Sequence, residues 1–271
     1  EKYADDCGED IARNLGYKNI ITKSANEYLK NETLVEAEFL SSGELGSGIV
    51  FHAFEKEFEN NVVFIGERGD KIWDKNRTDY NTEFRFDDEV FTGTSIIENR
   101  LRVGYIILPM PLFGACQWPS IHKISNSDEM KQYSIGGSYD RPIPRRILEA
   151  KGIDREMFGI EKKGAGFNYR FDNLSRIKKR MSKKSFYSFY NFYKKNKRSG
   201  LNLINAWFKF LWNTKSTYIS FFLNKIGISY KSNILTADAY SNPGAPSYLF
   251  NWGIYEMVKR YKRAGIKKWW I

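Results

Sequence analysis

The apolar positions of the first hundred residues alternate between helical and strand-like spacing. Helical spacing recurs over residues 2–16, 32–39 and 49–58. Gly16 is a typical helix-ending residue, and the β-rich run Asn19–Thr22 follows it. Asn61–Ile65 is a continuous apolar run between polar residues, which is typical of a strand buried on both faces. Such alternation predicts an α/β domain with a parallel sheet.

The pattern changes twice more along the chain. Residues 96–103 are predicted to be helical, and prolines interrupt the segment Leu108–Leu112. Pro142 and Pro144 break the chain before a short predicted helix, residues 145–151, which Gly152 ends. Beyond about residue 170 the chain becomes basic, aromatic-rich and mainly helical. We therefore expect a domain over residues 1–170 and a helical extension, residues 171–271, that packs on it.

The charge is distributed unevenly. The net charge is +11, but residues 1–100 hold 12 Lys/Arg against 22 Asp/Glu, whereas residues 101–271 hold 31 against 10. A basic second part favours phosphate-bearing partners or an anionic surface. Within it, residues 176–198 contain ten Lys/Arg and no acid, interleaved with Phe186, Tyr187, Phe189, Tyr190, Phe192 and Tyr193. These rings either bury one helix face or, with the basic side chains, bind RNA; an acidic membrane or partner is the third alternative.

Cysteine and histidine are scarce. Two of each occur, in no zinc-ligand spacing, which argues against a structural zinc site and a disulfide scaffold. No signal peptide opens the sequence, and the apolar stretch Tyr105–Cys116 is too short and too rich in proline to span a bilayer. These features predict a cytoplasmic protein without a transmembrane segment.

The segment Gly66-Glu67-Arg68-Gly69-Asp70 follows the predicted buried strand directly. In parallel sheets ligands bind at the carboxyl ends of strands. Two glycines allow close approach of the backbone to a ligand, and Asp70 can hold Mg²⁺ together with phosphate oxygens. The alternative is an ordinary strand-to-helix turn with solvated charges.

The segment Phe64–Trp73 resembles the second signature of asparagine-synthase-type ATP pyrophosphatases, in which a strand runs into a Gly-Glu-Gly-Ser-Asp-Glu-like loop. The resemblance covers roughly residues 1–170, through the segments Arg100–Gly104, Leu108–Pro111, Ile121–Ser127 and Tyr139–Arg146, with a fainter echo at Tyr248–Trp252. It implies a partial Rossmann-like (HUP) parallel sheet with flanking helices, and it implies ATP and Mg²⁺ as cofactors.

The resemblance also implies roles for individual residues. Ile65, Gly66 and Gly69 would contact the nucleotide, Glu67 would lie near the acyl-adenylate and the incoming amine, and Asp70 would coordinate magnesium and pyrophosphate. The segment Glu161–Phe167 is similar to the family's late lysine loop, so Lys163 would neutralise pyrophosphate and Lys162 would contact the nucleotide. Arg68 replaces a family glycine and Lys71 replaces a family acid, which puts the metal chemistry in doubt.

The family's first signature, a Ser-Gly-Gly-x-Asp-Ser phosphate loop, is missing from the sequence. Ser134–Asp140 imitates it, but no apolar strand precedes this segment, and Arg141–Pro144 is not expected to continue as a helix. We therefore interpret residues 134–140 as a decoy, and we expect a domain that lacks its front end and binds Mg-ATP weakly by itself.

Three functions remain open. The first is ATP-dependent amide formation, in which a small-molecule carboxylate is adenylated and then attacked by an amine. The second is a tRNA-modifying enzyme of the same superfamily that binds RNA through residues 176–198. The third is a degenerate, non-catalytic binding module. The sequence identifies neither the acceptor acid, nor the amine donor, nor the oligomeric state.

Overall fold

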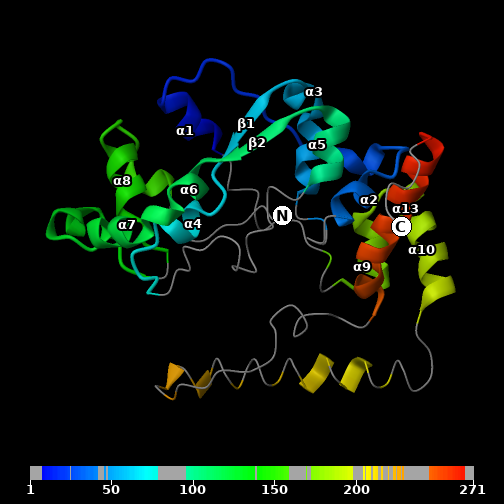
Figure 1. Cartoon of the computed structure of the whole chain (residues 1–271). Coiled ribbons are helices and arrows are strands. Elements are labelled where there is room, and N and C mark those ends of the chain that lie inside the picture. Colours follow the sequence, from blue (N-terminus) through cyan, green and yellow to red (C-terminus); the bar gives the residue numbers. More distant parts are fainter. Residues whose placement is uncertain are drawn as a thin grey trace. The chain divides into compact units, whose positions relative to one another are not determined.

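The computed structural model describes residues 8–24, 26–41, 46, 48–78, 96–137, 139–158, 169, 172–197 and 244–265, and single positions between 204 and 228. The chain divides into two compact units, whose elements are labelled in Figure 1. The first unit comprises Glu1–Ser24 and Phe54–Gly166, and the second comprises Ala25–Ala53 and Phe167–Ile271. In the described part helices predominate, and a two-stranded parallel sheet lies in the first unit.

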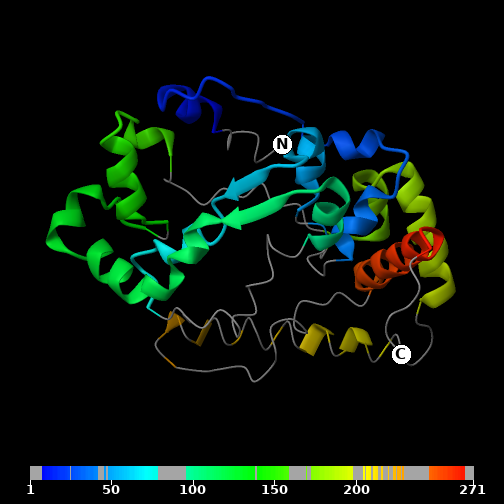
Figure 2. The ribbon, with the colours of Figure 1, turned by 45° about the horizontal axis from the view of Figure 1, so that its top comes forward.

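The sheet is built from two similar successions of helix, turn, strand and helix. In the first, α3 (Glu55–Phe58) leads to β1 (Val62–Ile65) and α4 (Gly69–Ile72). In the second, α5 (Ile97–Val103) leads to β2 (Ile106–Pro109) and α6 (Met110–Phe113). The strands are parallel, in a register that pairs Val62 with Ile106 and Ile65 with Pro109. Figure 2 shows both strands running in the same direction.

A left-handed residue ends the turn before each strand. Gly104 (φ +83°) is the C-cap of α5, and Asn60 (φ +59°) lies two residues beyond the end of α3. Glycine adopts this conformation without steric cost, and asparagine tolerates it better than most residues. The amide of Asn60 donates to the carbonyl of Gly104 over 2.9 Å, so the two turns are joined.

The expected burial of β1 on both faces is wrong. Val62 is 48% exposed and Phe64 is 64% exposed, whereas Val63 and Ile65 are half-buried. Among the described residues β1 pairs with β2 alone, so the sheet offers it one neighbour rather than two. The expected parallel direction is confirmed, and a larger Rossmann-like sheet is not seen in the described residues.

The other described elements of the first unit are helical. Its remaining elements are α1 (Glu9–Asn14), η3 (Ala115–Gln117), α7 (Trp118–Ser125), η4 (Asp128–Tyr133), α8 (Pro142–Glu149) and η5 (Arg155–Met157). Gly16 follows α1 with φ +82°, as expected of a residue that ends a helix. Residues 19–22 form no strand. Ile72 and Ala115 form a small core against which Trp73, Trp118 and Ile121 pack.

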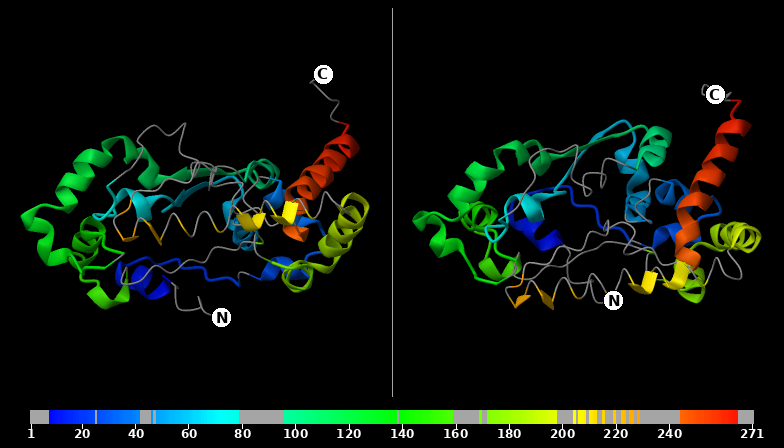
Figure 3. Two further views of the ribbon diagram at one scale, coloured as in Figure 1. Left: turned by 90° about the horizontal axis from the view of Figure 1, so that it is seen from below. Right: turned by 60° about the horizontal axis from the view of Figure 1, so that its bottom comes forward.

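The second unit is a cluster of helices with an aromatic core. Its elements are η1 (Glu27–Lys30), α2 (Val35–Leu40), η2 (Ile49–Phe54, which reaches the unit boundary), α9 (Leu174–Arg180), α10 (Lys183–Asn196), η6 (Ala245–Tyr248) and α13 (Leu249–Arg263). Figure 3 shows α10 and α13 from two further sides. Residues 25–53 thus belong to the same unit as the basic part of the chain.

Helices α2 and α13 touch at the level of their backbones. A Cβ atom added to Gly253 of α13 would lie 2.6 Å from the Ser41 amide nitrogen and 3.0 Å from the Ala37 carbonyl oxygen. No larger residue fits there without moving one helix. The neighbouring Trp252 is fully buried, and its ring meets Phe189 of α10 edge to face at 5.8 Å.

The aromatic residues of α10 serve mainly to pack this core. Phe186 and Phe189 belong to it, and Tyr190, Phe192 and Tyr193 pack against it partly buried. Tyr187 is 66% exposed. The packing interpretation of this stripe is therefore confirmed for five of its six rings, and Tyr187 is the one of the six that is exposed.

A buried carboxylate joins α2 to the start of α10. Glu36 is fully buried, and its oxygens accept hydrogen bonds from the Ser182 amide, from the Ser182 hydroxyl (3.0 Å) and from the Ser185 hydroxyl. Ser182 is the N-cap of α10, and a helix amino end favours a negative charge. Burial nevertheless dominates and raises the pKa of Glu36, although the hydrogen bonds act in the opposite direction.

In the part of the chain that the structure describes, no helix combines the length and the apolar character needed to cross a bilayer.

Candidate active site

The loop after β1 is a tight turn into α4. The amide of Gly69 donates to the carbonyl of Gly66 over 3.1 Å, and the amide of Ile72 donates to the carbonyl of Arg68 over 2.9 Å. Arg68 is the left-handed residue of this turn, with φ +70°, and it is buried. Backbone conformations of this kind are costly for residues other than glycine and collect at functional sites. Arg68 occupies the position at which the family resemblance has glycine.

The two glycines of the loop serve a purpose different from the expected one. Neither Gly66 nor Gly69 has a positive φ. A Cβ on Gly69 would lie 2.5 Å from the ring of Trp73 and 3.3 Å from Pro111, whereas a Cβ on Gly66 would meet nothing within 4 Å. Gly69 is therefore required for close packing against Trp73, and Gly66 leaves open space above the backbone.

A cavity of about 260 Å³ opens beside this loop. Its lining combines residues from the loop and α4 with residues that precede or belong to α8, and with one residue after η5: Gly66, Gly69, Asp70, Trp73, Tyr139, Arg141, Pro144, Arg145 and Phe158. Three of the expected site residues, Gly66, Gly69 and Asp70, thus lie together. Ile65 and Glu67 are not among the lining residues, and Lys162 and Lys163 lie outside the described residues.

Arg141 holds the two sides of this cavity together. Its Nε donates to the backbone carbonyl of Asp70 over 2.9 Å, and Nη2 donates to the same oxygen. Its guanidinium carbon lies 3.3 Å from the centre of the Tyr139 ring, a cation–π contact. The residue is only 9% exposed, and Nη1 has no hydrogen-bond partner. A buried, incompletely bonded guanidinium is the chemical feature of this cavity that most clearly calls for a ligand.

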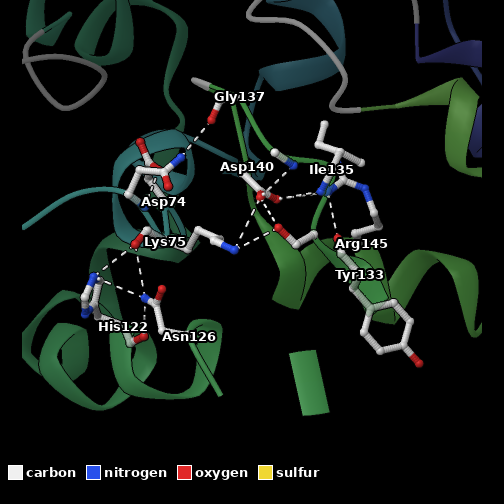
Figure 4. Close-up of polar contacts among 12 residues, drawn as sticks. Asp74, Lys75, His122, Asn126, Tyr133, Ile135, Gly137, Asp140 and Arg145 are labelled. Carbon is white, nitrogen blue, oxygen red and sulfur yellow. Dashed lines mark hydrogen bonds and ion pairs between the residues drawn. The ribbon is translucent and has the colours of Figure 1, made fainter. Parts of the chain in front are cut away.

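Asp140, the residue before Arg141, is buried and is the centre of a network of polar contacts (Figure 4). Its carboxylate accepts hydrogen bonds from the Ser134 hydroxyl, the Ile135 amide (3.3 Å) and the Gly136 amide (3.1 Å). Lys75 Nζ lies 3.6 Å from this carboxylate and Arg145 Nη1 lies 3.5 Å from it. Burial by itself would raise the pKa of Asp140, but the hydrogen bonds and the charge of Lys75 outweigh burial and lower it.

The same network fixes the segment that carries Lys75. The carbonyl of Lys75 accepts hydrogen bonds from His122 Nε2 of α7 (3.1 Å) and from Nδ2 of Asn126, the C-cap of α7 (3.1 Å). The Lys75 ammonium donates to Ser134 over 2.8 Å (Figure 4). Asn76 Nδ2 donates to the carbonyl of Gly137 over 2.8 Å. The residues that follow α4 are therefore tied both to α7 and to the loop before α8.

The Ser134–Asp140 segment binds its own aspartate. The element before it is the 3-10 helix η4 and not a strand. The amides of Ile135 and Gly136 already donate to Asp140. Those amides are not free to grip a phosphate, which supports the interpretation of the segment as a decoy. The expectation that no helix follows it is wrong: α8 begins at Pro142, because proline is well suited to the first turn of a helix, where its missing N–H has no partner to lose.

Sequence reasoning did not single out Trp73, Tyr139 and Arg141, which line the cavity together with Asp70. Arg141 and Tyr139 entered only as part of the family resemblance, and Trp73 only as the end of a motif. The Asp140-Arg141-Pro142 sequence carried a usable signal, since an arginine directly before a helix-starting proline is held at a helix amino end, where a basic residue is unfavourable unless an anion or a carbonyl meets it.

Metal ligands are sparse at this site. No group of three or more His, Cys, Asp or Glu that could hold a metal ion occurs among the described residues. Asp70 is the carboxylate that lines the cavity. Mg²⁺ commonly uses one or two carboxylates together with phosphate oxygens and water, so Asp70 fits this ion only when a phosphate group accompanies it.

Comparison with family models, with curated proteins and with solved structures finds no match to this chain.

Proposed function

We propose that the first unit belongs to an ATP-dependent amide-forming enzyme, in which a carboxylate is adenylated with release of pyrophosphate and then attacked by an amine. The observation that carries this proposal is the placement of Gly66, Gly69 and Asp70 after the carboxyl end of a parallel strand, around a cavity that a buried arginine also lines. Sites of α/β proteins lie at this end of parallel strands. A partial Rossmann-like sheet and a cytoplasmic location form part of the same proposal.

The residues of this chain would divide the work as follows. The open space above Gly66 lets a substrate approach the backbone, and Gly69 keeps Trp73 close to the loop. Asp70, in the first turn of α4, would hold Mg²⁺, which neutralises phosphate charge when it is bound with ATP. Glu67, which is half-buried and follows Gly66 in the loop, would accept a proton from the attacking amine, and Lys163 would meet the pyrophosphate.

Pyrophosphate release from ATP is the measurement that tests this proposal. The intact protein should release pyrophosphate when acid and amine substrates are supplied, and Asp70→Ala should abolish the release. Asp128→Ala is the matched control, because the side chain of Asp128 is 92% exposed and pairs only with Lys131 in its own helical turn. Unchanged release in Asp70→Ala would show that the assignment is wrong.

A groove in the second unit favours RNA binding as a second candidate function. It lies between α10 and α13, has a volume of about 390 Å³, and is lined by Ser188, Asn191, Phe192, Lys195, Asn196, Tyr255, Glu256 and Lys259. Two lysines beside the paired rings of Phe192 and Tyr255 (5.3 Å) could meet phosphate and base together. Polynucleotide retention that falls steeply with salt would support it; absent or salt-independent retention would remove it.

A further inference from the structure

Arg141 forms no ion pair with any carboxylate in the described part of the molecule. Two of its nitrogens donate to a neutral carbonyl, that of Asp70, and no carboxylate lies within ion-pair distance of the third, Nη1. The neighbouring Arg145 differs, because Asp140 lies 3.5 Å from it and the Tyr133 carbonyl accepts its hydrogen bond over 2.9 Å. A buried ion without a counter-charge is expensive, so an anionic group of a ligand is expected at Arg141.

The rest of the cavity wall is largely apolar. Trp73, Tyr139 and Phe158 contribute rings and Pro144 contributes an aliphatic surface. Walls of this kind bury a hydrophobic body, whereas phosphate sites are lined by backbone amides and several cations. The amides nearest in sequence, those of Ile135 and Gly136, already donate to Asp140. The charged side chains of the lining are Asp70, Arg141 and Arg145, and Arg145 is already paired with Asp140. The lining thus combines an apolar enclosure with Arg141 as the cation that has no ion pair.

The size of the cavity limits the ligand. About 260 Å³ lies just below the range of roughly 300–1,000 Å³ that is usual for small-molecule sites. A whole nucleotide does not fit inside it, so only the phosphate end of Mg-ATP would reach Asp70 at this cavity, whereas an acid with one ring or a short branched chain fits completely. The cavity therefore suits the substrate that receives activation better than it suits ATP.

We propose that this cavity binds a small organic acid with an aromatic or branched apolar body, whose carboxylate is held by Arg141 and whose body lies against Trp73 and Phe158. The inference rests on the proposed function in one respect, namely that this acid is the carboxylate to be adenylated. Arg141 is then a substrate-binding residue that selects acids over neutral molecules of the same shape. Tyr139 stacks on its guanidinium and keeps it in place.

The first test compares acids with their neutral amides on the unmodified protein, by calorimetry without ATP. Phenylacetate should bind at least roughly tenfold more tightly than phenylacetamide, because a charge-assisted hydrogen bond is lost in the amide. Acetate, which has no body, should bind more weakly than phenylacetate. Equal binding of phenylacetate and phenylacetamide would overturn the proposal, as would tighter binding of inorganic phosphate or pyrophosphate than of any acid.

The second test uses two arginines that are five residues apart. Arg141→Met should weaken phenylacetate binding at least roughly tenfold, and Arg141→Lys, which keeps the charge, should weaken it less. Arg146→Met is the control, because Arg146 pairs with the exposed Glu129 and does not line the cavity. Phenylacetate binding unaffected by Arg141→Met would overturn the proposal; if that variant does not fold, the comparison of acid and amide on the unmodified protein decides.

Failure of this inference can be told from failure of the proposed function. Acid-dependent pyrophosphate release without Arg141-dependent acid binding would overturn the inference and leave the proposed function standing. Arg141-dependent acid binding without any acid-dependent pyrophosphate release would support the binding site and remove adenylation.

Discussion

Among the described residues each of the two units holds a carboxylate with no exposed surface, and the pKa values of these two carboxylates shift in opposite directions. Asp140 in the first unit has a lowered pKa, whereas Glu36 in the second has a raised pKa. Glu36 accepts three hydrogen bonds, whereas Asp140 accepts three from neutral donors and a long one of 3.5 Å from Arg145 Nη1. The two carboxylates also differ in their cations: Lys75 and Arg145 lie within 4 Å of Asp140, and no described cation forms an ion pair with Glu36.

Hydrogen bonds and the amino end of α10 reduce the cost of burying Glu36, but burial still prevails and raises its pKa. At Asp140 the hydrogen bonds from Ser134, Ile135 and Gly136, with a smaller contribution from the charge of Lys75, outweigh burial and lower the pKa. The first unit therefore depends on an ionised network beside its cavity, while the second depends on the packing of its aromatic core.

Removal of Asp140 is expected to have the largest effect. Asp140→Ala leaves the ammonium of Lys75 and the guanidinium of Arg145 without their shared anion, which should cost the first unit about 3–5 kcal/mol. Hydrogen exchange followed through urea unfolding would locate the loss. Asp128→Ala is the control and should change little. A loss of stability in Asp140→Ala no larger than in Asp128→Ala would show that the network does not stabilise this unit.

A crowded contact in the second unit should come next. A glycine-to-alanine change inside a helix normally stabilises it by about 1 kcal/mol, but in Gly253→Ala the new methyl would collide with the backbone of α2. We expect a net loss of about 1–3 kcal/mol from overpacking, with faster exchange of α2 and α13. Asn251→Ala, at an exposed position of the same helix, should not lower the stability of the second unit in this way. A stabilised Gly253→Ala would show that the two helices separate easily.

The two units should also differ in their dependence on pH. Glu36 has a raised pKa in the folded protein. Its contribution to the stability of the second unit is therefore present below the ordinary pKa of 4.5 and is lost as the pH rises through the pKa of the folded protein. Asp140 has a lowered pKa in the folded protein. Its contribution to the stability of the first unit is therefore present above the ordinary pKa of 3.8 and is lost as the pH falls through the pKa of the folded protein.

The stability of each unit, measured by hydrogen exchange, would show these opposite slopes. In Glu36→Gln the stability of the second unit should no longer fall as the pH rises. In acid, where the carboxyl of the original protein is protonated and therefore also neutral, the substitution should lower the stability by roughly 1–2 kcal/mol. An unchanged slope in Glu36→Gln would assign the pH dependence to another group.

The smallest effect is expected at Lys75. Its side chain is 24% exposed, so Lys75→Met should cost only about 1 kcal/mol at neutral pH. Because the lysine helps to lower the pKa of Asp140, the acid loss of stability in the first unit should begin at a higher pH in this variant. Titration of hydrogen exchange towards acid would detect that shift, and its absence would assign the lowered pKa to the hydrogen bonds.

The local pattern predicted the elements better than their surroundings. Residues 62–65 form a strand because the run is apolar and rich in β-branched residues. Their burial depends on which elements pack against the strand, and the spacing of apolar residues does not specify those elements. The partner strand, Ile106–Pro109, was missed because its prolines pointed to a loop, although proline is tolerated at the end of a strand on a sheet edge. The helix over residues 96–103 was predicted within one residue.

The site was predictable in part for the same reason. Gly66, Gly69 and Asp70 are adjacent in sequence, so their proximity follows from a single turn. Arg141 reaches the same cavity from 71 residues further on, and its contact with the Asp70 carbonyl is a tertiary event that no local pattern contains. The left-handed Arg68 was equally hidden, because a sequence that has arginine where glycine is favoured gives no sign of the conformation.

The hydrogen bond between the turns at Asn60 and Gly104 has a consequence for how the sheet forms. The two residues stand at the same offset as the paired strand residues Val62 and Ile106, so the turns align the strands before the first rung of the ladder. The register is thus fixed partly by residues that lie outside both strands. A pairing shifted by one or more residues would have to break the hydrogen bond between Asn60 and Gly104. Such an arrangement leaves the strand side chains free to change during evolution as long as these two corners persist.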